Sequence, residues 1–234
     1  MHKINPLNVE ELVIDIFDIQ QSGSADQFRN DFSEPVLNIC ELIKNCYASY
    51  LQFESHKEPD SQFSYMAAYT FALVESLYTS LKLLVYGFLA PSGNQFRLAL
   101  EALALSALLS WRNQLMVNKR QNKWKCTNFF EDFLEDKRWA RPHLAIKILD
   151  ENKERLGFSE EAIGLLAESK KLYNNYSHAS LLSIRAIIIS PERVLFGGGY
   201  DHEQKPLFEK ELEIRKRFIE KIPIFLDTLY TKSV

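Results

Sequence analysis

The chain has 234 residues, of which 46% are hydrophobic and 25% charged, and this balance is ordinary for a globular protein with a sizeable core. The three cysteines (Cys40, Cys46 and Cys126) are odd in number and lack CxxC spacing, which excludes a disulfide framework and predicts reduced thiols in a cytoplasmic protein. The longest charge-free runs, of about 14 residues, are shorter than a membrane-spanning helix, and the acidic N-terminal segment does not have the pattern of a secretory signal.

Helical periodicity dominates the first half of the chain. Four helices are expected over residues 7–20, 26–55, 62–89 and 95–117, with breaks at SGSADQ, SHKEPDSQ and APSGN. Pro35 marks a kink or a restart in the second of them. The stretch LALEALALSALL is apolar nearly all round, which indicates a buried central helix. We therefore expect the third and fourth helices to form an antiparallel hairpin in the middle of the fold.

The second half mixes helices with one strand signal. A polar, basic connector is expected at 117–126, and helices at about 127–138, 142–157, 158–184 and 206–230. Two apolar runs flank Pro191, a pattern that predicts a β-hairpin near residues 186–199. The predicted fold is therefore all-α: a bundle of about seven to eight helices with one small β-hairpin, in a single domain over residues 1–234. Residues 1–60 carry four basic and eleven acidic residues and could form an acidic helical extension.

Three charged residues interrupt the apolar helices: Glu75, Arg97 and Glu101. Arg97 and Glu101 are four residues apart, so they share a helix face. Because buried charges are costly unless they are paired, this pair indicates a role in tertiary structure.

The stretch YNNYSHASL (173–181) places polar side chains within the helix expected over 158–184, which otherwise has the pattern of a buried helix. Lys171, Asn174 and His178 fall on one face of that helix, and Tyr173 and Tyr176 fall on a second face.

We hypothesise that Arg97, Glu101, Tyr173 and His178 meet in one polar cluster, in which a carboxylate would raise the pKa of the imidazole. The alternative is that these groups only fix the geometry of the core, because structural ion pairs perturb titration as readily as active sites do. The candidate catalytic residues are His178, Arg97 and Glu101, and the candidate binding residues are Lys171, Tyr173, Asn174 and Ser177.

Three stretches carry a family resemblance: FRLALEALALSALL, the later YNNYSHAS, and the apolar hairpin that ends in GGGYD. They resemble a group of bacterial helical proteins of unknown function, in which an Arg…Glu pair on one helix accompanies a Tyr…Ser…His segment on a later one. The likeness covers roughly residues 62–203. More distantly, the pattern resembles the HEPN helical bundles, many of which are metal-independent RNases of toxin and phage-defence systems.

The HEPN resemblance implies a role for His178 at the attacking 2′-hydroxyl or the leaving oxygen, with a cation near the phosphate. The HEPN motif is an Arg and a His separated by four to six residues on one helix. Here Lys171 stands six intervening residues before His178, and a lysine lacks the planar two-point contact of an arginine. Arg138 and His143 have the spacing, but Pro142 between them is expected to begin a new helix.

Residues 112–147 hold nine basic and four acidic residues, with aromatic side chains among or beside them. Basic residues interleaved with aromatics can follow a nucleic-acid backbone and stack its bases, so RNA is a possible partner of this region. The alternative is a solvated loop whose aromatics dock into the core. The aromatic residues concerned are Trp111, Trp124, Phe129, Phe130 and Trp139.

The segment GGGYDHE lacks the lysine and the Ser/Thr of a phosphate-binding loop, and its consecutive Asp201, His202 and Glu203 point in different directions. We expect no metal site and no cofactor. Two functions remain open. One is a non-catalytic helical module that acts through a protein partner, self-association (for example as a dimer) or a small ligand, in the defence or toxin–antitoxin context that the resemblance implies. The other is a HEPN-like metal-independent RNase or RNA-binding protein that uses His178.

Overall fold

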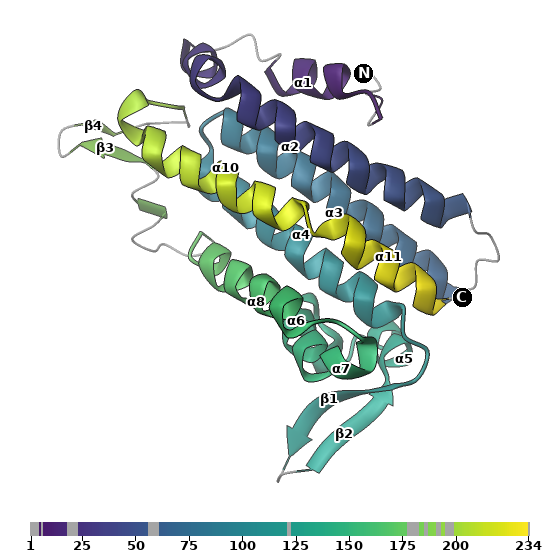
Figure 1. Cartoon of the computed structure of the whole chain (residues 1–234). Coiled ribbons are helices and arrows are strands. Elements are labelled where there is room, and N and C mark those ends of the chain that lie inside the picture. Colours follow the sequence, from purple (N-terminus) through teal and green to yellow (C-terminus); the bar gives the residue numbers. More distant parts are fainter. Residues whose placement is uncertain are drawn as a thin grey trace.

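The computed structural model describes residues 5, 7–17, 23–55, 61–120, 123–176, 183–184, 187–190, 193–194 and 199–233, and most of them are helical (Figure 1). The N-terminal half consists of α1 (Val9–Phe17), α2 (Gly23–Ser55), α3 (Ser61–Val85) and α4 (Leu89–Leu109). The middle holds β1 (Gln114–Arg120), β2 (Lys123–Asn128), α5 (Phe129–Leu134), the 3-10 helix η1 (Arg138–Ala140), α6 (Pro142–Glu151), α7 (Lys153–Leu156) and α8 (Glu160–Asn174). The last part holds β3 (Ile188–Ser190), β4 (Arg193–Val194), η2 (His202–Gln204), α10 (Lys205–Ile219) and α11 (Ile222–Ser233).

The predicted all-α bundle is confirmed, and so is the small hairpin near residues 186–199, which is formed by β3 and β4. Helices α3 and α4 form the expected antiparallel hairpin at the centre, and every residue of α4 from 99 to 109 is buried. Helix α2 packs along α3, and α10 and α11 follow one another along α2 (Figure 1). Helices α6 and α8 pack against α4. The core is therefore built around α4, which needs apolar residues on all sides.

The break expected at APSGN is wrong by a few residues, because that segment lies inside α4. The chain turns earlier, at Gly87, whose φ of 74° is in the left-handed region that glycine favours. Pro91 stands in the first turn of α4, where a backbone N–H has no partner within the helix. Gly93 lies against the Tyr176 ring, since a Cβ there would come within 2.3 Å of that ring. Pro91 therefore fits the first turn of α4, and Gly93 allows the close contact of α4 with the Tyr176 ring.

The segment expected to be a basic connector contains a second hairpin, formed by β1 and β2. The strands are antiparallel, and an irregularity interrupts the register between Met116 and Asn118. Asn152, a buried residue just after α6, holds the strand at this point: its side-chain oxygen accepts from the Met116 backbone N–H at 2.9 Å, and its nitrogen donates to the Met116 carbonyl at 2.8 Å. These two bonds satisfy the Met116 backbone groups as a neighbouring strand would, and they fix the hairpin to the bundle.

The C-terminal segment is tied to α2 through Asp31. Its carboxylate accepts from the Tyr200 hydroxyl at 2.6 Å and from the Lys205 ammonium at 3.0 Å, and the ring nitrogen Nδ1 of His202 lies 3.1 Å away. The hydrogen bond from Tyr200, with those from Lys205 and His202, holds the pKa of Asp31 far below its usual value. The contact anchors the start of α10 and so positions the side chains that α10 sends into the core.

Among the helices that the structure describes, none combines the length and the hydrophobicity needed to span a lipid bilayer. Cys40 and Cys46 are buried in α2, and burial raises the pKa of each thiol to about 12. Cys126 is exposed on β2. The two buried thiols are therefore held in the protonated form, which is the unreactive one.

Candidate functional site

Arg97 and Glu101 form an ion pair on α4, with Nη1 of the arginine 2.7 Å from Oε1 of the carboxylate. The Nε and Nη2 groups of Arg97 donate to Asn94 Oδ1 at 3.3 and 3.2 Å. Glu101 is buried, whereas the Arg97 side chain keeps 20% of its surface exposed. The arginine is thus held by side chains of its own helix, with one edge of the pair toward the surface.

Lys170 on α8 is partly buried and interacts electrostatically with both members of this pair, whereas Lys171 is exposed. The Lys170 ammonium donates to the backbone carbonyl of His143. Burial lowers the pKa of Lys170, the Glu101 charge opposes that change, and the Arg97 charge adds to it. Two cations therefore lie near one buried carboxylate at the contact of α4 with α8.

Tyr173 belongs to a different network, centred on α10. Its hydroxyl donates to Glu211 Oε2 at 3.1 Å, and the Tyr176 hydroxyl donates to Glu211 Oε1 at 2.6 Å. Arg215, one turn along α10, pairs with the same carboxylate. Arg215 and Glu211 are only 1% and 3% exposed, so this is a fully buried ion pair. Tyr173 near the end of α8 and Tyr176 just after it thus both donate to this pair through Glu211.

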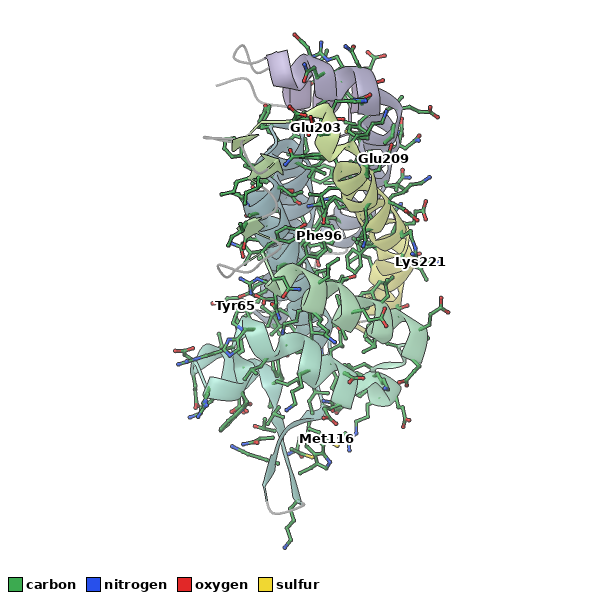
Figure 2. The ribbon with its side chains drawn as sticks, turned by 90° about the vertical axis from the view of Figure 1, so that its left-hand side faces the viewer. Tyr65, Phe96, Met116, Glu203, Glu209 and Lys221 are labelled. Carbon is green, nitrogen blue, oxygen red and sulfur yellow. The ribbon has the colours of Figure 1, made fainter. Side chains whose placement is uncertain are left out.

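Arg215 joins four helices. Its Nη1 donates to the Tyr173 hydroxyl at 3.2 Å, its Nη2 to Ser92 Oγ on α4 at 2.8 Å, and its Nε to Ser80 Oγ on α3 at 3.3 Å. The guanidinium carbon also lies 5.2 Å from the centre of the Phe96 ring, which is near the middle of the bundle in Figure 2. Because each of its nitrogens has a partner, the network has the character of a structural polar core.

Burial is the main cause of a raised pKa at both Tyr173 and Tyr176, and the nearby Glu211 charge adds to it. Both hydroxyls therefore stay protonated and act as donors at any physiological pH. This protonation state suits a fixed set of hydrogen bonds around Glu211.

The remaining predicted residues are placed as follows. Asn174 is partly buried at the last residue of α8, and Ser177 and His178 lie outside the described residues. Glu75, which the sequence placed inside an apolar helix, is exposed on α3 and accepts from the Thr79 hydroxyl at 3.0 Å. Of the four residues hypothesised to meet, the structure brings Arg97 and Glu101 together and places Tyr173 in the α10 network.

A hollow of about 500 Å³ lies between the β1–β2 hairpin, η1 and α6. In Figure 2 the hairpin extends from the bundle near Met116, at the end opposite Glu203. The hollow is lined by Met116, Val117, Asn118, Trp124, Arg138, Trp139, Leu144, Lys147, Ile148 and Glu151. We call it the hairpin hollow. It combines an apolar floor with two indole rings and two cations, and its volume is typical of a ligand site.

Trp139 is held firmly in the hairpin hollow. Its indole Nε1 donates to Asp132 Oδ2 at 2.6 Å, and the Lys125 ammonium lies 3.9 Å from the centre of its ring. The aromatic residues of the basic region thus fall into two groups, some docked into the core and others accessible for stacking. Phe129 is buried in the core, whereas Trp124 and Trp139 remain half-buried at the hairpin hollow.

A second hollow of about 350 Å³ lies between the start of α8 and α11. Its lining is mainly apolar, and Phe158 and Phe225 stack there with ring centres 4.2 Å apart. The polar groups at its lining, such as Glu161 and Lys221, are exposed. Charged and amide side chains make up a larger share of the lining of the hairpin hollow than of this second hollow, and such groups give a site its specificity, so the hairpin hollow is the stronger candidate.

The part of the chain that the structure describes contains no group of three or more His, Cys, Asp or Glu side chains placed to hold a metal ion. Comparisons of the chain with protein-family models, with curated proteins and with solved structures find no match. The chemistry of the hairpin hollow and of the Arg97–Glu101–Lys170 group therefore carries the argument about function.

Proposed function

We propose that this chain is a non-catalytic helical binding protein that holds single-stranded RNA at the hairpin hollow. The observation that carries the proposal is the lining itself, in which two indole rings and two exposed cations converge on one 500 Å³ space. Arg138 and Lys147 form no ion pair within the described ranges, although other lysines, such as Lys153, have acidic partners. Their charges are thus available to a ligand.

The chemistry of the hairpin hollow fits a nucleic-acid strand. A base that stacks on an aromatic side chain contributes about 1–3 kcal/mol to binding, whatever its identity. Arg138 and Lys147 can neutralise phosphates and release counterions, which makes affinity depend on salt. A base must be unpaired before it can enter such a hollow, so a single strand fits and a duplex does not.

The Arg215–Glu211 network fits this proposal as part of the scaffold. Its charged groups are fully buried and bond to one another and to Tyr173, Tyr176 and two serines. A group without free hydrogen-bonding capacity or exposed surface has little to offer a ligand. The binding residues are expected instead where cations and aromatic faces are still accessible.

The test is the affinity for a labelled single-stranded RNA of about 12 nucleotides, measured by fluorescence anisotropy at low and at moderate salt. The double variant Arg138→Glu/Lys147→Glu is expected to bind at least about tenfold more weakly, because it removes two phosphate contacts and adds repulsion. Its salt dependence should also be shallower than that of the wild type.

The matched control is Lys210→Glu/Arg217→Glu, which makes the same charge change at two exposed positions of α10. Circular dichroism should show that both variants keep the wild-type helix content. Equal weakening by the two double variants would mean that only the net charge matters. That result, or no binding by the wild type at low salt, would reject the hairpin hollow as the site.

A metal-independent RNase that uses His178 is the second candidate, and the placement of Lys170 favours it. Lys170 and Arg97 provide two cations beside the buried Glu101, close to the end of α8, from which the chain continues toward His178. In this alternative Lys170, rather than Lys171, would contact the phosphate, because Lys170 is the lysine that interacts electrostatically with the Arg97–Glu101 pair.

This second candidate predicts RNA cleavage in the presence of a chelator. The variant His178→Ala should lose cleavage while it keeps its helix content, and the exposed-residue control Lys171→Ala should retain it. Cleavage is read by gel electrophoresis of a labelled RNA. Intact RNA after incubation with the wild type would argue against an RNase and leave binding as the function.

A further inference from the structure

Glu151 is an unexpected residue for a site that only binds phosphates. It is the acidic member of a lining that otherwise holds apolar, aromatic, amide and basic side chains. It is exposed at the last residue of α6, one turn after Lys147, yet no ion pair within 4.0 Å joins the two in the described structure. A carboxylate here repels a phosphate backbone, so its presence needs another reason.

We propose that Glu151 recognises the edge of a stacked base and that the hairpin hollow prefers guanine. This inference rests on the proposed function, since it names the base that the RNA-binding site selects. An ionised carboxylate only accepts hydrogen bonds, and its two oxygens can accept two parallel ones. The Watson–Crick edge of guanine presents two adjacent donors, N1–H and the N2 amino group, which match that pair of oxygens.

The other bases match Glu151 less well. Adenine and cytosine each present one amino donor beside a ring nitrogen that accepts, and that acceptor would face a carboxylate oxygen. Uracil presents one N–H between two carbonyl oxygens. In each case only one oxygen of Glu151 would gain a donor from the base, so the paired hydrogen bonds that guanine offers would not form. Guanine is therefore expected to bind more tightly than adenine, cytosine or uracil.

The residues around Glu151 support the same orientation of the base. Trp139 lines the hairpin hollow and is fixed by Asp132, and because Lys125 covers one face of its ring, a base would stack on the opposite face. Lys147, one helical turn before Glu151, can donate to guanine O6, which lies beside N1 on the same edge. Arg138 neutralises the phosphate beside a bound guanine, and Lys147 contacts a phosphate where the stacked base is not guanine.

The experiment compares four uridine-rich RNAs of about 12 nucleotides that differ only in a single central G, A, C or U, by fluorescence anisotropy. The wild type is expected to bind the G-containing RNA about tenfold more tightly than the other three. The variant Glu151→Gln keeps the size of the side chain but turns one acceptor into a donor. It should bring the affinity for the G-containing RNA down to that of the others.

The matched control is Glu168→Gln, which makes the same change at an exposed position on α8, and it should keep the preference for guanine. Equal binding of the four RNAs by the wild type, with affinity that still depends on Arg138 and Lys147, would overturn the inference and leave the proposed function in place. A guanine preference that survives in Glu151→Gln would also overturn it. Absence of binding to all four RNAs would instead remove the proposed function.

Discussion

Replacing Arg215 with leucine is expected to lower the free energy of unfolding by about 3–5 kcal/mol, the largest loss that we expect from the core. The reason is the buried Glu211 carboxylate, which would keep only the two tyrosine hydroxyls as donors. Ser80 and Ser92 would also lose the donor that links α3 and α4 to α10. Urea unfolding followed by circular dichroism measures the change.

Two further variants separate the loss of the ion pair from a loss of packing. The double variant Arg215→Leu/Glu211→Met removes both charges, and it should recover much of the lost stability because no buried charge is left alone. Arg217→Leu, two residues along α10 and exposed, should change stability by no more than about 0.5 kcal/mol. A single variant Arg215→Leu as stable as the wild type, or a double variant no better than the single one, would contradict the account of this network.

The sequence contained a usable signal for this network, although local spacing alone points the other way. Glu211 and Arg215 are four residues apart in the order that commonly stabilises an exposed helix surface. However, Arg215 lies three residues after Leu212 and three before Phe218, both of which are buried, so it falls on the apolar stripe of α10. The sequence placed Tyr173 and Tyr176 on one face of their helix, but nothing in it identified α10 as the helix that supplies their hydrogen-bond partner.

The β1–β2 hairpin was harder to predict because its stability is tertiary. Its strands hold three lysines and two asparagines, which disfavour strand structure, and they lack a clean alternation of apolar and polar residues. The decisive contact is the Asn152 side chain on Met116, from 36 residues away in the sequence. This hairpin forms one wall of the hairpin hollow. The sequence therefore predicted basic and aromatic residues suited to RNA in this region, but it did not predict that they would surround a hollow.

The central helical hairpin was predicted correctly, and its turn was misplaced for a physical reason. Pro and Gly usually end helices, so APSGN was the natural choice for the break. In the structure Gly87 makes the turn, while Pro91 and Gly93 are tolerated within α4. A single glycine between two apolar runs gives a weaker local signal than a Pro–Ser–Gly cluster, yet its left-handed φ and its contact with another segment both require glycine.

Gly87→Ala is therefore expected to lower the free energy of unfolding by about 3 kcal/mol or more. The positive φ strains any residue with a Cβ, and that Cβ would come within 1.9 Å of the Gly199 carbonyl oxygen. The clash is between the Cβ itself and backbone atoms of Gly199, so a side-chain rotation cannot relieve it. The expected consequence is a displacement of residues 199–200, and with them of the Tyr200 contact to Asp31 that anchors the start of α10.

The chain offers a matched control for this substitution. Gly164 lies in α8 with ordinary helical backbone, and no atom is within 4 Å of a Cβ built there. Gly164→Ala should therefore raise the free energy of unfolding by up to about 1 kcal/mol, because alanine is the better helix former. Both changes are measured by urea unfolding. A Gly87→Ala variant as stable as the wild type would mean that the α3–α4 turn does not pack on Gly199, and the proposed link between the central helical hairpin and α10 would have to be abandoned.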